Sequence, residues 1–211
     1  MTKISIKEKT DISIVLCGQA GQGIQTVEKL LTRISKTAGY NVFATKEYMS
    51  RVRGGMNSTL IRISNKPVKA FVDRIDILVP LSKGAIRHLE KRINPKTIIV
   101  GEKDVYADEL KDKVQLFDIP FTKIASDIGN KVYSNTVAVG ALISVVSIKP
   151  KEVIDFLKQF FEGKPQEVVE KNIEALKKGY EKANKFSKPN SVNIKITNDI
   201  KLKNPESPNT G

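Results

Sequence analysis

Cysteine is nearly absent from this sequence, since Cys17 is the only one among 211 residues. A single cysteine cannot form an internal disulfide, and by itself it cannot hold a zinc ion or an iron–sulfur cluster. Tryptophan is missing and aromatic residues make up only 6% of the chain, so the stacking surfaces that single-stranded nucleic acids require are scarce. These shortages argue against a disulfide scaffold, a metal centre and a nucleic-acid-binding protein.

Long apolar stretches are also lacking. None approaches the roughly 20 residues of a membrane-spanning helix, and residues 1–10 lack the apolar segment of a signal peptide. We therefore expect a cytoplasmic protein that does not contact a membrane. The net charge of +13 suits an anionic partner such as a phosphorylated ligand, a nucleic acid or an acidic protein. Because the lysines are scattered along the chain, a solvated basic surface is an equally simple explanation.

Apolar residues recur with the spacings of alternating strands and helices. Strands are predicted at residues 11–17, 41–45, 57–64, 75–80, 97–100 and 114–117, and helices at residues 23–38, 82–92, 122–128, 135–147, 151–161 and 166–185. This alternation predicts an α/β fold with an open, mostly parallel sheet and helices on both faces, a Rossmann-like arrangement in three layers. The last two helices are expected to form a C-terminal helical hairpin that turns at residues 163–165.

Domain boundaries follow from composition. Residues 1–10 are predicted to be a flexible arm, residues 11–185 the α/β domain, and residues 186–211, rich in Asn and Pro, a polar tail or linker. The strand, glycine turn, helix and strand within residues 11–45 predict a right-handed βαβ unit with a parallel sheet. Residues 65–72 are expected to form a turn and a short extended piece, a candidate hairpin partner for the preceding strand.

Local signals indicate where the helices begin and end. Gly39 is expected to end the first helix at its C′ position. Ser82 is predicted to cap the helix over residues 82–92, and Asn135, with Ser134, to cap the buried helix over residues 135–147.

A glycine-rich loop follows the first predicted strand. Gly18, Ala20 and Gly23 match the spacing of the dinucleotide-binding fingerprint, with alanine at the middle position, and Gly21 and Gln22 lie between them. The first glycine is expected to permit the turn and the last to allow close packing of helix and strand. The start of the next helix offers free N–H groups and a partial positive charge, which suit a phosphate. No Lys-Ser or Lys-Thr follows, so this is not a Walker loop.

The second strand does not supply the carboxylate that a nicotinamide ribose requires. It ends at Thr45-Lys46, and Glu47 is the nearest acid. Three interpretations of the loop stay open: a site for a phosphorylated ligand, a structural turn or subunit contact, and a nicotinamide or flavin site.

A second group of candidate residues follows the second strand: Lys46, Tyr48, Arg51, Arg53, Gly54, Gly55 and Asn57. Two arginines beside a glycine pair can grip phosphates with bidentate hydrogen bonds, while the bare backbone lets a ligand or another chain approach. A loop that only holds subunits together explains the block equally well. Lys46 either pairs with a phosphate or is solvated, and Asn57 either donates to a ligand or caps a turn.

The single His and the single Cys do not suggest a nucleophile. His88 lies within a predicted helix and is expected at the surface, whereas Cys17 ends a buried strand and is expected to be a small core residue. No catalytic residue and no metal ligand is predicted.

Taken together, the motifs resemble one family. The stretches GQAGQGIQT at 18–26, GY at 39–40, KEYMSRVRGGMNSTLIRIS at 46–64, DILVPL at 76–81 and YSNTVAVGAL at 133–142 occur in this order. The chain resembles, over residues 11–180, the gamma subunit or gamma domain of 2-oxoacid:ferredoxin oxidoreductases. Two features depart from the family pattern: alanine at position 20, where glycine is usual, and the tail ending in NPESPNTG, which is compatible with the start of a linker to an alpha domain.

The resemblance implies a division of labour. Such enzymes oxidise pyruvate, 2-oxoglutarate or branched-chain 2-oxoacids with coenzyme A and reduce ferredoxin. Thiamine diphosphate and iron–sulfur clusters would belong to the alpha, beta and ferredoxin-like (delta) partner subunits. The chain would be inactive alone and would contribute to assembly and to binding of coenzyme A, and the isolated subunit is expected to be able to form a homodimer. A stand-alone module that binds a phosphorylated ligand or acts as a regulator is the alternative.

The glycine loop is the predicted binding site for the ADP part of coenzyme A. Its residues Gly18 to Gly23 would act together with Lys46 and with Arg51 or Arg53. The identity of the 2-oxoacid is not expected to be encoded in this chain.

Overall fold

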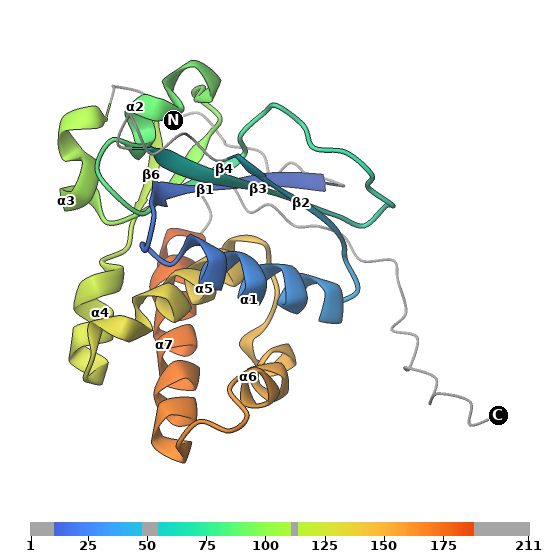
Figure 1. Cartoon of the computed structure of the whole chain (residues 1–211), viewed down its shortest axis with the longest axis vertical. Coiled ribbons are helices and arrows are strands. Elements are labelled where there is room, and N and C mark those ends of the chain that lie inside the picture. Colours follow the sequence, from blue (N-terminus) through green and yellow to red (C-terminus); the bar gives the residue numbers. More distant parts are fainter. Residues whose placement is uncertain (1–10, 48–54, 111–113, 188–211) are drawn as a thin grey trace.

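A six-stranded mixed sheet lies at the centre of the protein in the computed structural model (Figure 1), which describes residues 11–47, 55–110 and 114–187. The strands are β1 Asp11–Gln19, β2 Asn41–Glu47, β3 Met56–Ser64, β4 Ile77–Pro80, β5 Ile98–Gly101 and β6 Gln115–Asp118. Their order in the sheet is β2-β3-β1-β4-β5-β6. Strands β1, β4, β5 and β6 pair in parallel, whereas β3 is antiparallel to both β1 and β2. The predicted α/β class with a mostly parallel sheet is confirmed.

The first strands differ from the predicted βαβ unit. Strands β1 and β2 do run in the same direction, but β3 lies between them and pairs with both. Each of the nine residues of β1 has a partner on β3, from Asp11 opposite Ser64 to Gln19 opposite Met56. Residues 65–72 form no strand, so the hairpin partner of β3 is β2 and not the segment that follows it.

Helices cover the two faces of the sheet unequally. One side carries α1 Ile24–Thr37, α4 Phe121–Ile128, α5 Ser134–Val145, α6 Ile154–Phe160 and α7 Gln166–Asn184, and the other side carries α2 Ala85–His88 and α3 Lys103–Tyr106 (Figure 1). Short 3₁₀ turns follow or precede them: η2 Glu90–Arg92, η3 Ala107–Glu109, η4 Lys131–Tyr133, η5 Pro150–Glu152 and η6 Lys185–Ser187. The prediction of helices on both faces is confirmed. The face covered by α1 and α4 to α7 is called the thick side below, and the face covered by α2 and α3 the thin side.

The alternation of β1 divides the core into two parts. Ile14 and Leu16 point into the large cluster under the long helices, while Val15 and Cys17 point into the smaller cluster under α2 and α3. Because successive side chains of a strand point to opposite faces, a strand buried on both faces is apolar at nearly every position.

The C-terminal helices meet at two glycines. A Cβ atom on Gly140 of α5 would lie 2.1 Å from the backbone oxygen of Leu176, and one on Gly179 of α7 would lie 2.0 Å from that of Val137. The two helices can therefore lie this close only because neither position carries a side chain. The predicted turn at residues 163–165 does separate α6 from α7, with Gly163 at a φ of 81°, but α7 packs most extensively against α5.

Two predicted helix caps are wrong. The segment over residues 82–92 is a four-residue helix followed by a 3₁₀ turn, and its N-cap is Gly84 rather than Ser82. The carboxylate of Glu109 accepts hydrogen bonds from the backbone N–H groups of Gly84 and Arg87 and so fills the capping role from a distant segment. At α5 the N-cap is Tyr133, and no side chain caps that helix.

The arm predicted over residues 1–10 lies outside the described residues, as do residues 188–211 of the tail predicted over residues 186–211. The helix over residues 23–38 is confirmed as α1, and it ends as expected. Gly39 has a φ of 86°, and the N–H groups of Gly39 and Tyr40 donate to the carbonyls of Lys36 and Ser35.

Candidate functional site

The glycine loop lies at the carboxyl end of β1 and leads directly into α1. The turn depends on Gly21 and Gly23, with φ values of 87° and 81°, a region of the backbone map that favours glycine. Gly18 is still part of β1, and an added Cβ would lie 3.2 Å from Cβ of Leu81 and 3.4 Å from Oγ of Ser82, so its small size serves close packing rather than the turn. The predicted role of Gly18 in the turn is therefore not seen, whereas Gly23 serves the turn and also allows a close contact with Asn135 of α5.

Residues at the start of α1 line a cavity of about 300 Å³. Gly23 is the N-cap, no side chain caps the helix, and its first turn contains no acidic residue. This is the arrangement in which a helix N-terminus attracts an anion. The cavity is lined by Gln19, Ala20, Gly21, Gly23, Ile24, Gln25, Thr26, Lys46, Asn57, Ser58 and Thr59.

This cavity brings together residues from both predicted groups. Ala20, Gly21 and Gly23 of the loop lie in it with Lys46 at the end of β2 and Asn57 near the start of β3. These residues come together because β3 lies between β1 and β2. Its pairing with β1 places Asn57 directly opposite Gly18 and Met56 opposite Gln19. Gly55 immediately precedes β3 and so lies beside the end of β1. Tyr48, Arg51, Arg53 and Gly54 lie outside the described residues.

Lys46 is held by a carboxylate of the first helix. Its Nζ lies 2.9 Å from Oε2 of Glu28, whose side chain is only 13% exposed. This ion pair offsets part of the positive charge that the lysine brings to the cavity. A phosphate bound here would therefore compete with Glu28 for the ammonium group.

Glu47, the acid nearest in sequence to the position expected for a ribose ligand, points to the opposite face of the sheet. Its carboxylate accepts a hydrogen bond from Ser58 Oγ at 2.8 Å and lies 3.8 Å from Arg92 Nη1. In a dinucleotide-binding fold, the acid that binds the ribose follows a parallel strand that lies directly beside the first strand. Here the antiparallel β3 lies between β1 and β2, so Glu47 is not placed to bind a ribose.

A second cavity, of about 310 Å³, lies on the other side of the loop. It is lined by Gln22, Pro80, Leu81, Ser82, Glu102, Val105, Phe121, Thr122, Ser134 and Asn135. The helices that follow β1 and β4 lie on opposite faces of the sheet (Figure 1). Ligands of open α/β sheets bind at this kind of switch point.

Two residues of this second cavity were assigned other roles from the sequence. Ser82 Oγ accepts a hydrogen bond from the N–H of Gln19 at 3.0 Å and thereby joins the segment after β4 to the end of β1. The amide of Asn135 lies against Gly23, where an added Cβ would come within 2.0 Å of Nδ2. Both stand within or next to the motifs that carry the family resemblance, and this was a signal that could have pointed to them.

The remaining single residues agree with the sequence prediction. His88 is exposed at the end of α2, and Cys17 is fully buried. Burial, together with the nearby carboxylates of Glu109 and Glu47, raises the pKa of the Cys17 thiol to about 12.

Comparison with known proteins decides the family. The sequence matches the family described as pyruvate ferredoxin/flavodoxin oxidoreductase over residues 13–182. The chain belongs to the gamma-subunit family of 2-oxoacid:ferredoxin oxidoreductases. It is therefore a subunit of an oxidoreductase that has several subunits.

Similar proteins support this membership of the gamma-subunit family. The 2-oxoglutarate synthase subunit KorC of Methanocaldococcus jannaschii is 31% identical over 87% of this chain and 98% of that protein. The gamma subunit of a keto/oxoacid ferredoxin oxidoreductase from Geobacter sulfurreducens has the same fold, with a TM-score of 0.68 at 20% identity, covering 82% of this chain and 99% of that one.

A longer protein also contains this fold. The 2-oxoglutarate:ferredoxin oxidoreductase of Magnetococcus marinus, solved with 2-oxoglutarate, coenzyme A and succinyl-CoA, matches with a TM-score of 0.76 at 24% identity. The match covers 90% of this gamma subunit but 33% of that chain. Among the helices in the described part of the gamma subunit, none combines the length and apolar character that crossing a bilayer requires.

Proposed function

We propose that this gamma subunit binds the ADP part of coenzyme A at the glycine loop and helps to assemble the oxidoreductase. The observation that carries the ligand proposal is the shared cavity at the start of α1, where the loop, Lys46 and Asn57 meet. Coenzyme A supplies phosphates for the free N–H groups and for the lysine. The Magnetococcus enzyme, which contains this fold, was solved with coenzyme A bound.

Two properties of the cavity favour this ligand over a nicotinamide cofactor. The neighbour of β1 on this side is the antiparallel β3, and Glu47 faces away from the cavity, so the acid that ends the second strand is not placed for a ribose. Phosphate binding needs only N–H groups and a cation, which the first turn of α1 and Lys46 offer. We infer that Arg51 or Arg53 adds a second cation, because their segment leads into β3 beside the loop.

The ligand proposal is tested by calorimetric titration of the assembled oxidoreductase with coenzyme A. Lys46→Ala should weaken binding about tenfold, because a charged hydrogen bond contributes roughly 1.5–3 kcal/mol. Arg51→Ala and Arg53→Ala are titrated in the same way. The matched control is Lys36→Ala. This exposed lysine lies in the last turn of α1, at the end far from the cavity, and its removal should leave the affinity for coenzyme A unchanged. Wild-type affinity in all three variants would refute phosphate binding at this loop.

Glu28→Gln provides an independent check of the same proposal, because it is expected to raise the affinity for coenzyme A rather than lower it. Removing this carboxylate frees Lys46 from its ion pair and should tighten the binding of coenzyme A. Weaker binding would mean that Glu28 orients the site rather than competing with the ligand.

The assembly role rests on two large apolar side chains that are exposed in the described part of the subunit. Phe71 in the segment between β3 and β4 is 55% exposed, and Val132 in η4 is 69% exposed. Contact with another chain would remove these apolar side chains from water, which is favourable. We expect the alpha, beta and ferredoxin-like subunits to cover them. Native purification of the chain without these partners would favour the alternative, a stand-alone ligand-binding or regulatory module.

A further inference from the structure

The segment that joins β3 to β4 holds its exposed aromatic ring in a fixed place. Arg62 of β3 donates to the carbonyl oxygen of Ala70 at 3.1 Å, directly before Phe71. Arg92 of η2 donates to the carbonyl oxygen of Asp73 at 3.2 Å, and its Nε lies 3.0 Å from Oδ1 of the same residue. The backbone is thus bound on both sides of Phe71, which is 55% exposed. A ring that is held in this way loses little conformational freedom when another molecule covers it.

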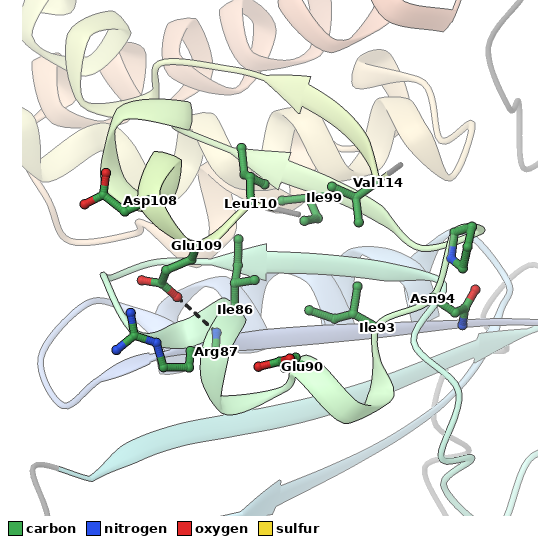
Figure 2. Close-up of a pocket in the computed structure, with 11 residues that line it drawn as sticks. Ile86, Arg87, Glu90, Ile93, Asn94, Ile99, Asp108, Glu109, Leu110 and Val114 are labelled. Atoms are coloured by element: carbon green, nitrogen blue, oxygen red, sulfur yellow. Dashed lines mark hydrogen bonds between the residues drawn. The ribbon is translucent and has the colours of Figure 1, made fainter. Parts of the chain in front are cut away.

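A third cavity lies beside η2 on the thin side of the sheet and has a volume of about 440 Å³. It is an apolar slot, and Figure 2 shows its two walls: Ile99, Leu110 and Val114 along one, Ile86 and Ile93 along the other. Ile93 directly follows Arg92, the residue that binds the Phe71 segment. The slot and the exposed ring are therefore joined through η2.

The acidic side chains at the edge of the slot are already engaged. Glu109 accepts hydrogen bonds from backbone N–H groups of α2, one of them drawn in Figure 2, and Asp108 pairs with Lys83 at 3.0 Å. Glu90 also has an interaction of its own. The slot thus offers its apolar walls to another molecule rather than free charges, and filling it with an apolar group is favourable.

Lysines set the charge around Phe71. Lys66 and Lys69 are exposed, and within the described residues neither side chain forms an ion pair. A second copy of the chain that met this face about a two-fold axis would bring the lysines of both copies into one contact, where like charges repel. A different chain that carries carboxylates around an apolar pocket is complementary. The gamma subunit belongs to an oxidoreductase that has several subunits, so such chains accompany it.

We propose that the Phe71 segment and the slot together form the docking face for another subunit of the oxidoreductase. The ring of Phe71 enters an apolar pocket of that subunit, whose carboxylates face Lys66 and Lys69, and an apolar side chain of the same subunit fills the slot. The proposal rests on the assembly role proposed above and assigns one face of the molecule to it.

This docking face is separate from the glycine loop. Asp11, at the start of β1, pairs with Ser64, and the Phe71 segment begins directly after Ser64. The glycine loop lies at the other end of β1, and a strand of this length spans roughly 27 Å. Substitutions in the docking face should therefore leave the affinity of the assembled enzyme for coenzyme A unchanged.

The affinity of the gamma subunit for its purified alpha, beta and ferredoxin-like subunits, measured by biolayer interferometry, tests the proposal. Phe71→Ala should weaken binding at least about tenfold, because truncating a central aromatic anchor has an effect of this size. Phe71→Leu keeps an apolar side chain and should stay within about threefold of the wild type. Ile93→Ser removes part of the slot wall and should weaken binding in the same direction as Phe71→Ala. The midpoint of urea unfolding is measured for each variant, to separate lost contacts from lost folding.

A charge reversal tests the lysines of the face. Lys69→Glu should slow association several-fold at low salt, because it opposes the attraction to carboxylates of the other subunit. The matched control is Lys164→Glu, an exposed lysine between α6 and α7, which should leave the association rate unchanged.

The outcomes separate this face from the assembly role itself. Tight binding of the wild type with equal affinity in Phe71→Ala and Ile93→Ser would overturn the docking face and leave the assembly role intact. Failure of the folded wild-type chain to bind any of the three subunits would refute the assembly role. A dimer of the chain alone that Phe71→Ala dissociates, seen by light scattering, would assign the face to contacts between copies and would also overturn the proposal.

Discussion

The surroundings of Cys17 determine the pKa and the reactivity of its thiol. Its side chain is fully buried between the sheet and the helices α2 and α3, and two carboxylates lie near it. The pKa of the thiol rises from its ordinary value of 9.0 to about 12. Because the thiolate is the reactive form, this cysteine should be chemically inert in the folded protein.

We expect iodoacetamide at pH 8 to leave Cys17 unmodified in the native chain and to label it completely in urea, as measured by intact mass. The raised pKa also affects stability. The thiol ionises above pH 9 in the unfolded chain but only near pH 12 in the folded chain, so the free energy of unfolding falls as the pH rises from 9 to 12. Rapid labelling in native buffer would contradict the observed burial.

The residues near the glycine loop show which single-residue positions could be predicted from the sequence. Lys46 was predicted as a site residue because it ends a strand, and Asn57 was predicted either to donate to a ligand or to cap a turn; both lie at one cavity with the loop. The pairing of Lys46 with Glu28 was not foreseeable, because it depends on how α1 crosses β2. Ser82 and Asn135 looked like helix caps, since their residue types suit that role, yet both lie against the loop instead.

At the scale of elements, the crossing of α5 and α7 depends on two glycines that allow backbone contact. Gly179→Ala should lower the free energy of unfolding by about 2–3 kcal/mol, because the new methyl group would lie 2.0 Å from the oxygen of Val137 and the helices must separate. The change is measured as a shift in the midpoint of urea unfolding.

The control for that prediction is Lys177→Ala, an exposed position on the same helix, which should change stability by no more than about 0.5 kcal/mol. A similarly small effect of Gly179→Ala would mean that the two helices adjust without cost.

Most elements were predictable because their apolar periodicity is local. The buried α5 and the amphipathic α1 appeared in the sequence close to their observed bounds. The order of the strands was not predictable in this way. Strand β3 has the same apolar character whether it lies at an edge or between β1 and β2, and its place is set by pairing with residues far away in the chain.

The whole molecule is a subunit, and its chemistry is expected to depend on other chains. Within the described residues no group of three His, Cys, Asp or Glu side chains is arranged to hold a metal ion. We expect the purified chain to show no oxidation of pyruvate or 2-oxoglutarate with coenzyme A and a ferredoxin substitute, and the complex to be active once the partner subunits are added. Turnover by the isolated chain in a dye-reduction assay would refute this division of labour.

The insertion of β3 between β1 and β2 also sets an order of events during synthesis. When β1 leaves the ribosome, neither of its neighbours exists, because its partners lie on β3 and β4. Strands β2 and β3 can form a hairpin on their own, since they follow each other in the chain. The nascent chain must therefore keep β1 unpaired, with the helix after it already made, until the hairpin arrives and closes the sheet around it.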